Sequence, residues 1–270
     1  QIQIYMGKNH YEPATKPTLY FIGVTTSKSS IMNVFPKWAE YLRLGECEIK
    51  GFDFLPHDET KKYQECVEFI KKDPLSKGAL VTTHKIDIYL SCFDQFDYLD
   101  EHAKSMGEIS CISKDGNKLL GHAKDTITSD LALNLILPGD YWNENGGEVL
   151  CLGAGGAAIA ILYNLNRQTQ YKNHPSKIIV TDIKKSRLES IKQIFRQFDK
   201  NVPLELHQCS EAKNNDDLSK YLKPHSLIIN ATGLGKDKPG SPFTWNVQYP
   251  QNCIVWELNY RGELIFLDQA

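Results

Sequence analysis

The stretch that decides the fold is Gly147–Ala160, which reads GEVLCLGAGGAAIA. Its apolar run Val149–Leu152 is typical of a strand that is buried on both faces. Three glycines follow at once, at Gly153, Gly155 and Gly156, and the apolar residues after them indicate a helix. Strand, glycine turn and helix in this order predict a site that binds a dinucleotide.

Each residue type in this turn has a physical reason to be there. Gly153 lets the chain turn tightly off the strand, and Gly155 lets the backbone approach a pyrophosphate with no Cβ in the way. Ala158 is small enough to pack the helix against the strand, and the N–H groups of the first helical turn face the phosphates. The expected cofactor contacts are Gly153, Ala154, Gly155, Gly156 and Ala157. The alternative is an ordinary tight turn between a strand and a helix.

The next predicted strand, Lys177–Thr181, is followed by an acidic residue, Asp182. A carboxylate there accepts hydrogen bonds from a ribose 2′-hydroxyl and repels a 2′-phosphate, so it favours NAD as the cofactor. The gap from the glycines exceeds the usual ~20 residues, and a polar loop over Asn166–Ser176 accounts for the excess. Two alternatives stay open. Asp182 can instead cap the following helix, and the 2′-phosphate of NADP can be held by the basic residues Lys184, Lys185 and Arg187.

Length and composition are those of an ordinary globular protein. The 270 residues are 41% hydrophobic and 24% charged, and they suffice for two domains. The net charge of −2 gives no reason to expect nucleic acid or a membrane as a partner. No apolar run approaches the ~20 residues of a membrane span, and the start, Gln1–Pro13, does not read as a secretory signal. We therefore expect a cytoplasmic protein.

The seven cysteines are scattered along the chain, and none forms a C-x-x-C pair. This pattern favours free thiols in a reducing compartment over disulfides, and it predicts no metal site. The cysteines are Cys47, Cys66, Cys92, Cys111, Cys151, Cys209 and Cys253.

Predicted strands and helices alternate along both halves of the chain, which indicates an α/β fold. In the first half we expect strands over Thr18–Val24, Gly51–Leu55 and Gly78–Thr82, helices over Ile31–Leu44, Thr60–Lys71, Ile86–Phe96 and Leu99–Met106, and a hairpin over Ile109–Ser113 and Lys118–Gly121. A helix Thr126–Leu137 and a polar linker Asp140–Gly147 lead to the second half. Beyond Asp182 we expect a helix Ser186–Phe198, strands Pro203–Gln208, Ser226–Asn230 and Cys253–Leu258, a polar stretch Glu211–Asp217, and a final helix from Leu264.

Three polar stretches of the first half belong together: Thr25–Ser30, Val81–Lys85 and Gly121–Asp125. The first two follow the carboxyl ends of predicted strands, where open α/β sheets gather ligand groups. With the glycine turn, they give a series of landmarks that resembles the shikimate/quinate dehydrogenase family nearly end to end. GVTTSKSS resembles the family's glycine strand end followed by S-x-S, and GALVTTHK its G-x-N-V-T-x-P-H-K, shortened by one residue. GEISCIS stands where A-V-N-T is usual and GHAKD where G-x-N-T-D is usual, and LCLGAGGAA, IINATGLG and LNYRGELIFLDQA complete the series.

The resemblance implies a role for each matching residue. Lys85 and Asp125 would form the catalytic pair. The substrate-binding residues would be Ser27, Ser29, Thr82, Ser110 and Tyr260. Asn230, Ala231 and Thr232 would lie along the cofactor beside the nicotinamide. Ser27 and Ser29 can equally be turn residues, and Tyr260 can equally pack in the core.

Elementary chemistry agrees with the implied pair. Oxidation of a secondary alcohol needs a hydride acceptor and a group that takes the hydroxyl proton. Desolvation lowers the pKa of a partly buried lysine towards the range in which it exchanges protons, whereas a nearby carboxylate raises it. The alternatives are a solvated Lys85 and an Asp125 that only caps the helix after it. We interpret the neighbouring His84 as a structural hydrogen bonder.

The chain departs from the family pattern where the substrate's ring hydroxyls would bind. Ser110 and Ala123 stand in place of two asparagines, and Lys124 replaces a threonine. A buried substrate hydroxyl left unpaired at Ala123 would cost ~1–3 kcal/mol. The family's late helix carries a substrate-binding glutamine, for which Gln269 lies too early in the chain. The expected ligand is therefore a small cyclic hydroxy acid related to shikimate or quinate.

These observations predict an α/β fold with an N-terminal substrate-binding and catalytic domain and a C-terminal Rossmann, doubly wound dinucleotide-binding domain. The expected bounds are 1–130 for the first domain, 131–147 for a connecting helix and linker, and 148–270 for the second. The leading hypothesis is an NAD(P)-dependent oxidoreductase of the shikimate/quinate dehydrogenase type, a monomer or homodimer. The alternatives are a ligand-binding sensor that keeps the two-domain cleft without chemistry and a folate-linked dehydrogenase of similar layout.

Overall fold

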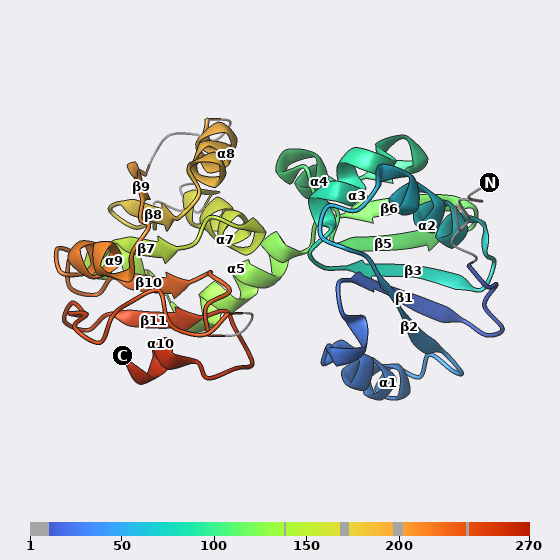
Figure 1. Ribbon diagram of the computed structural model, residues 1–270, viewed down its shortest axis with the longest axis horizontal. Helices are drawn as coiled ribbons and strands as arrows, with labels where there is room; N and C mark the ends of the chain where they lie inside the picture. The colour runs from blue at the N-terminus through green and yellow to red at the C-terminus, as the bar shows by residue number, and fades with distance from the viewer. Residues whose placement is uncertain (1–10, 138, 168–172, 197–201, 236–237) are drawn as a thin grey trace, which may run out of the picture. The chain divides into compact units, whose positions relative to one another are not determined.

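The computed structural model describes residues 11–137, 139–167, 173–196, 202–235 and 238–270. They form two compact units, which divide between Lys124 and Asp125, and each unit has its own sheet (Figure 1). The division places residues 125–136 in the second unit, whereas the sequence analysis assigned 125–130 to the first domain. Most of the segment Gln1–Pro13, the middle of the loop Asn166–Ser176 and the end of the helix Ser186–Phe198 lie outside the described residues.

The first unit contains a six-stranded mixed sheet in the order β2-β1-β3-β5-β6-β4. Its strands are β1 (Thr18–Gly23), β2 (Glu48–Asp53), β3 (Ser76–Val81), β4 (Tyr98–Leu99), β5 (Cys111–Asp115) and β6 (Lys118–His122). β5 runs antiparallel to both of its neighbours, and the other pairs are parallel. Because two antiparallel steps restore the direction, the carboxyl ends of β1, β2, β3, β4 and β6 share one edge of the sheet.

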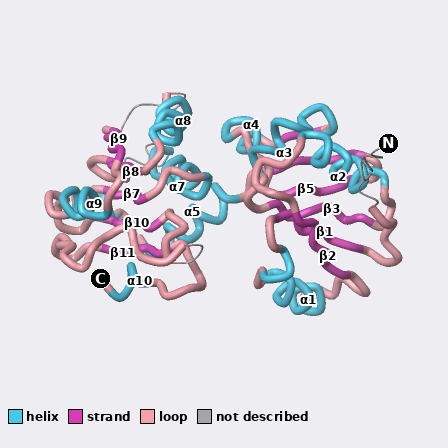
Figure 2. The backbone as a smooth tube through the Cα atoms, viewed as in Figure 1, coloured by secondary structure: helices cyan, strands magenta, loops and turns pink. Residues whose placement is uncertain are grey.

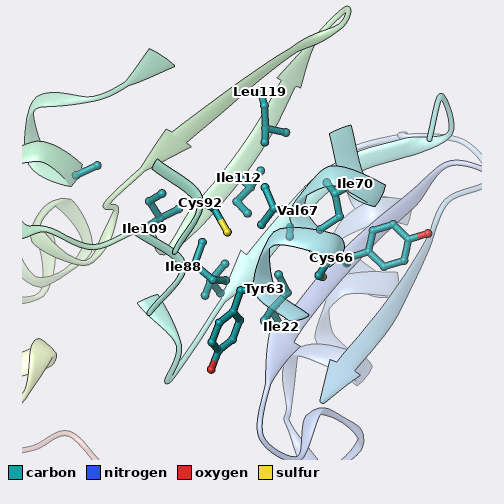
Figure 3. Close-up of a cluster of buried hydrophobic side chains, with 14 of the residues drawn as sticks. Ile22, Tyr63, Cys66, Val67, Ile70, Ile88, Cys92, Ile109, Ile112 and Leu119 are labelled. Carbon is teal, nitrogen blue, oxygen red and sulfur yellow. The ribbon is translucent and has the colours of Figure 1, made fainter. Parts of the chain in front are cut away.

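Helices of the first unit are α1 (Ile31–Tyr41), α2 (Thr60–Lys72), α3 (Lys85–Cys92) and α4 (Glu101–Met106), with short 3-10 turns η1 (Thr26–Lys28) and η2 (Phe93–Gln95). One apolar face of α2 packs against the sheet and contributes Tyr63, Cys66, Val67 and Ile70 to a buried cluster (Figure 3). This cluster anchors the segments that follow β3 at the carboxyl edge. This confirms the helix that the spacing of apolar residues predicted over Thr60–Lys71.

The second unit contains a five-stranded, fully parallel sheet in the order β11-β10-β7-β8-β9. Its strands are β7 (Val149–Leu152), β8 (Ile178–Asp182), β9 (Leu204–Gln208), β10 (Leu227–Asn230) and β11 (Ile254–Glu257). The helices are α5 (Asp125–Ile136), α6 (Tyr141–Asn145), α7 (Gly156–Arg167), α8 (Lys185–Phe195), α9 (Ala212–Ser219) and α10 (Ile265–Asp268). Figure 2 labels all of them except α6. β7 lies between β8 and β10, so the strand order reverses beside the glycine turn, where doubly wound folds bind nucleotides.

Several elements differ from the sequence prediction. The expected linker Asp140–Gly147 contains α6, whose Trp142 is buried. The expected polar stretch Glu211–Asp217 is largely α9, which begins with a capping box between Glu211 and Asn214. The short strand β4 lies where no strand was predicted. α1 ends at Tyr41, and its expected apolar face is largely exposed to solvent.

All seven cysteines are free thiols, as expected. Cys92 and Cys151 are fully buried, and burial raises the pKa of each to about 12. Buried, protonated thiols of this kind behave as small apolar side chains.

Candidate active site

The carboxyl edge of the first sheet gathers most of the residues to which the sequence assigned a substrate role. Ser27 and Ser29 follow β1, Thr82 and Lys85 follow β3, and Ser110 directly precedes β5. The strands β1, β3 and β5 are consecutive in the sheet, so these three segments are neighbours. Open α/β sheets bind ligands at this edge.

The segment after β1 is fixed by Thr26. Its backbone N–H donates to Asp53 Oδ1 at 2.8 Å, and its side chain packs on Gly51 of β2, where a Cβ would lie 1.9 Å from the Thr26 hydroxyl. Ser27 is exposed and Ser29 is half-buried, so both hydroxyls are accessible. Thr26 and Gly51 carry no motif, and the sequence analysis did not identify them.

Lys85 is the first residue of α3 and follows a tight, strained turn. Thr83 has a φ of 57°, in the left-handed region that non-glycine residues seldom adopt. The Thr82 N–H donates to Ile22 O at 2.9 Å, and the Lys85 carbonyl accepts from the Ile109 N–H at 3.0 Å. The turn is thus held by β1 on one side and by the segment before β5 on the other. Strain of this kind persists where surrounding structure imposes it, and it is common at functional sites.

His84 supports this turn from inside the unit. Its side chain is fully buried, and its Nδ1 lies 2.9 Å from the Tyr63 hydroxyl. Burial lowers the pKa of His84 below its usual value, so the ring is held in its neutral form. His84 is a structural hydrogen bonder, as the sequence predicted.

Ser110 is occupied by contacts within its own unit. Its side chain is almost fully buried, and its hydroxyl accepts from the Lys124 N–H at 2.7 Å and donates to His122 O at 3.4 Å. Ala123 is fully buried in the apolar core of the unit. Asp125 is the first residue of α5, and its carbonyl accepts from the Ser129 hydroxyl at 2.7 Å.

The glycine turn of the second unit has the shape that a pyrophosphate requires. Gly153 has a φ of 99°, and a Cβ there would lie 2.8 Å from the Ala231 carbonyl oxygen. A Cβ on Gly155 would meet no described atom within 4 Å, so the space beside it is open. The first turn of α7, which the structure describes in full, holds no acidic side chain. The uncompensated helix N-terminus and the open backbone both suit a bound anion.

Asp182 ends β8 and binds the glycine turn. Its Oδ2 accepts from the Ala154 N–H at 2.9 Å, and its Oδ1 accepts from the Lys184 N–H at 2.7 Å. Arg187 lies close by, with Nη1 3.7 Å from Oδ2. The carboxylate therefore has a structural role besides any contact with ribose.

A polar network holds the end of β10 beside this turn. The fully buried Asn230 donates to Glu257 Oε2 at 2.7 Å and accepts from the N–H and hydroxyl of Thr232 at 3.1 and 2.6 Å. Asn259 completes the network through Glu257 Oε1 at 2.8 Å and the Leu234 carbonyl at 3.1 Å. The sequence analysis missed Glu257 and Asn259. Asn259 lies in the quoted stretch LNYRGELIFLDQA but was given no role there, and Glu257 lies just before that stretch. Their other partners, Asn230 and the Leu234 carbonyl, are distant along the chain.

Tyr260 follows this network and is 62% exposed, so it is not a core residue. In the part of the chain that the structure describes, no helix is both long and apolar enough to cross a membrane. Among the same residues, no group of three histidine, cysteine, aspartate or glutamate side chains is arranged to hold a metal ion.

An α/β unit joined to a Rossmann-like unit defines the class of two-domain, dinucleotide-binding α/β proteins. No family model matches the sequence. The shikimate dehydrogenase (NADP(+)) of Caldicellulosiruptor saccharolyticus is 27% identical over 215 residues, which cover 78% of this chain and 68% of that protein. The enzyme of the same name from Bartonella tribocorum is 27% identical over 267 residues, 96% of this chain and 81% of that protein. Alignments to such relatives span from 53% to 81% of their lengths.

Solved structures give the same result for the fold. The shikimate dehydrogenase of Aquifex aeolicus matches with a TM-score of 0.70 and 21% identity, over 96% of this chain and 85% of that one. The quinate dehydrogenase of Corynebacterium glutamicum, solved in complex with NAD, matches with a TM-score of 0.69 and 18% identity, over 93% and 84%. The chain is thus similar in sequence to shikimate dehydrogenases and similar in fold to shikimate and quinate dehydrogenases, at low sequence identity.

Proposed function

We propose that this chain transfers a hydride between a nicotinamide dinucleotide and a secondary alcohol or ketone of a shikimate- or quinate-like cyclic hydroxy acid. The observation that carries the proposal is the place of Lys85, which follows a strained, well-supported turn at the carboxyl edge of the first sheet. Thr82 follows β3 in the same segment as Lys85, Ser110 directly precedes β5, and Ser27 and Ser29 follow β1. The similarity to shikimate and quinate dehydrogenases supports the same reaction class.

The proposed chemistry divides between the two units. When bound, the nicotinamide supplies the hydride acceptor for alcohol oxidation. Lys85 Nζ takes the proton of the substrate hydroxyl as the hydride leaves the carbon, and it returns a proton in the reverse direction. Asp125 orients the resulting ammonium, and Ser27, Ser29 and Thr82 bind the substrate carboxylate. Ser110 and Tyr260 complete the proposed substrate contacts.

The residues of the second unit fit a bound dinucleotide. The open space beside Gly155 and the free end of α7 receive the pyrophosphate, together with the backbone of Gly153, Ala154, Gly156 and Ala157. Ala231 and Thr232 follow Asn230 and extend along the nicotinamide half. The network through Glu257 fixes the position of this segment.

We propose NAD as the preferred cofactor. The Asp182 carboxylate at the end of β8 accepts hydrogen bonds from ribose hydroxyls and repels a 2′-phosphate. Arg187 acts in the opposite sense because its guanidinium attracts that phosphate. The named relatives act with NADP(+), so separate titrations with NAD and NADP decide the preference.

The decisive test is turnover with shikimate, quinate and other cyclic hydroxy acids, followed by the variant Lys85→Ala. We expect kcat to fall at least about a hundredfold, since general acid–base groups contribute ~10²–10⁴-fold. The affinity for the dinucleotide should stay unchanged. Lys77→Ala is the matched control, because Lys77 is an exposed lysine near the start of β3, the strand after which Lys85 follows.

Two outcomes contradict the proposal. Turnover by Lys85→Ala at the rate of the unmodified protein would remove Lys85 from the reaction. Binding of dinucleotide and cyclic acids without turnover would favour a ligand-binding sensor.

A further inference from the structure

Asp100 contacts three consecutive residues at the end of β6. Its Oδ2 lies 3.3 Å from His122 Nδ1 and 3.7 Å from Lys124 Nζ, and its Oδ1 accepts from the Ala123 N–H at 3.3 Å. The same Oδ1 caps α4 through the Ala103 N–H at 2.7 Å. The Asp100 and His122 side chains are only 14% and 17% exposed, so water weakens their contact little, whereas Lys124 is 45% exposed.

The contacted segment is also held from β5. His122 Nε2 lies 3.0 Å from the hydroxyl oxygen of Ser113 in β5. The Lys124 N–H donates to Ser110 Oγ at 2.7 Å. Residues 122–124 are therefore bound by Asp100 on one side and by β5 on the other. The next residue along the chain is Asp125.

We propose that Asp100 is a positioning residue for the reaction, which fixes His122–Lys124 and through them the placement of Asp125. This inference rests on the proposed function, in which Asp125 orients the Lys85 ammonium. The physical reason is the steep dependence of rate on geometry, because a displacement of ~1 Å can cost about a hundredfold. The contacts with three successive residues, 122–124, distinguish Asp100 from an ordinary helix cap, which needs only the contact with the Ala103 N–H.

The test is the variant Asp100→Ser. Serine is as good a cap as aspartate, so α4 keeps its first turn, whereas the shorter side chain loses His122 and Lys124. We expect kcat to fall by about ten- to a hundredfold. The KM for the cyclic acid and the Kd for the dinucleotide should change less than about twofold, because ground-state binding does not depend on Asp125 in this account.

Asp97 provides a matched control at the opposite end of the same strands. Its Oδ2 accepts from the Leu119 N–H at 2.8 Å and pairs with Lys71 Nζ at 2.8 Å, so it also joins a backbone amide of β6 to a lysine. Asp97→Asn weakens the contact with Lys71 and should leave kcat unchanged. A merely structural role for Asp100 predicts the same kinetics for both variants.

The outcomes separate the positioning role from the proposed function. One combination of results would overturn the positioning role alone. The unmodified protein turns over, Asp125→Asn does not, and Asp100→Ser keeps an unchanged kcat. Retained turnover in Asp125→Asn, or no turnover by the unmodified protein, would overturn both. Hydrogen exchange adds a readout besides activity. The Lys124 N–H should exchange faster in Asp100→Ser than in Asp97→Asn. Equal protection of this N–H in the two variants would show that the contacts of Asp100 do not hold residues 122–124 in place.

Discussion

At the scale of single residues, the candidate site depends on buried polar groups that pair within their own unit. His84 is the clearest example. It lies directly before Lys85, its ring meets Tyr63, and its neutral form is favoured by burial. Asp87 Oδ2 lies 4.0 Å from His84 Nδ1, and Asp87 Oδ1 lies 3.1 Å from His57 Nδ1, so one carboxylate lies between two histidines.

His84 gives a prediction about pH. In the folded state its pKa lies below the unfolded value of ~6.5, so the unfolded chain binds more protons as the pH falls. Stability therefore decreases when the pH drops below about 6.5. His84→Asn lacks this contribution, and the difference in unfolding free energy between the two proteins should narrow between about pH 7.5 and 5.5.

Urea unfolding at several pH values measures this difference. His57→Asn is the control, because the His57 side chain is 89% exposed in the folded protein. A difference between the parent and His84→Asn that stays constant across the range would show that His84 does not titrate differently on folding.

At the scale of elements, the structure joins each functional turn to the strand beside it. The Ala154 N–H in the glycine turn donates to Asp182 at the end of β8, and Gly153 is pressed against the Ala231 carbonyl after β10. The turn between β7 and α7 is thus held by both neighbouring strands. This arrangement presents the backbone amides of the turn in a fixed geometry, which lowers the entropy cost of binding a phosphate.

Asp182 gives a prediction at this scale. Asp182→Asn keeps an amide oxygen that can accept from Ala154 and removes the negative charge. We expect the Kd for NADP to fall by about tenfold, which is ~1.4 kcal/mol, because Arg187 then faces the 2′-phosphate without a competing carboxylate. Calorimetric titration measures both cofactors. Glu189→Gln is the control, since it removes an exposed charge from α8, and equal effects of the two variants would contradict a local role for Asp182.

At the scale of the whole molecule, the sequence predicted the two-sheet α/β organisation because its central strands are buried on both faces. The runs at Val149–Leu152, Ile178–Asp182 and Leu227–Asn230 are almost continuously apolar, and each is a strand. The Rossmann-like second unit follows from these runs and from the glycine turn between the first strand and its helix.

The elements that the sequence did not predict are stabilised by distant partners. α9 is a polar helix whose buried Asn215 donates to the Pro242 carbonyl at 2.9 Å. α6 begins where the Trp142 N–H meets Asn173 Oδ1 at 3.0 Å. The sequence around these helices does not indicate such contacts, because the partner residues are far away along the chain.

The candidate site, like the fold, could be predicted from the sequence only in part. Motifs indicated Lys85, Ser110 and the glycines, whereas Asp100 and Glu257 act through partners 22 to 27 residues away or on neighbouring strands. Their roles became visible only with the pairing of β4 with β6 and of β10 with β11.

The most direct test of the account is transfer of deuterium from a cyclic hydroxy acid that is labelled at the carbon bearing the reacting hydroxyl. After incubation of the protein with the labelled acid and NAD, mass spectrometry and NMR of the recovered dinucleotide locate the label. The account predicts one deuterium on the nicotinamide ring per turnover, and a rate of label transfer that is at least about a hundredfold lower with Lys85→Ala. A reduced ring that carries only solvent hydrogen, or a dinucleotide that stays oxidised with every acid tested, would contradict it.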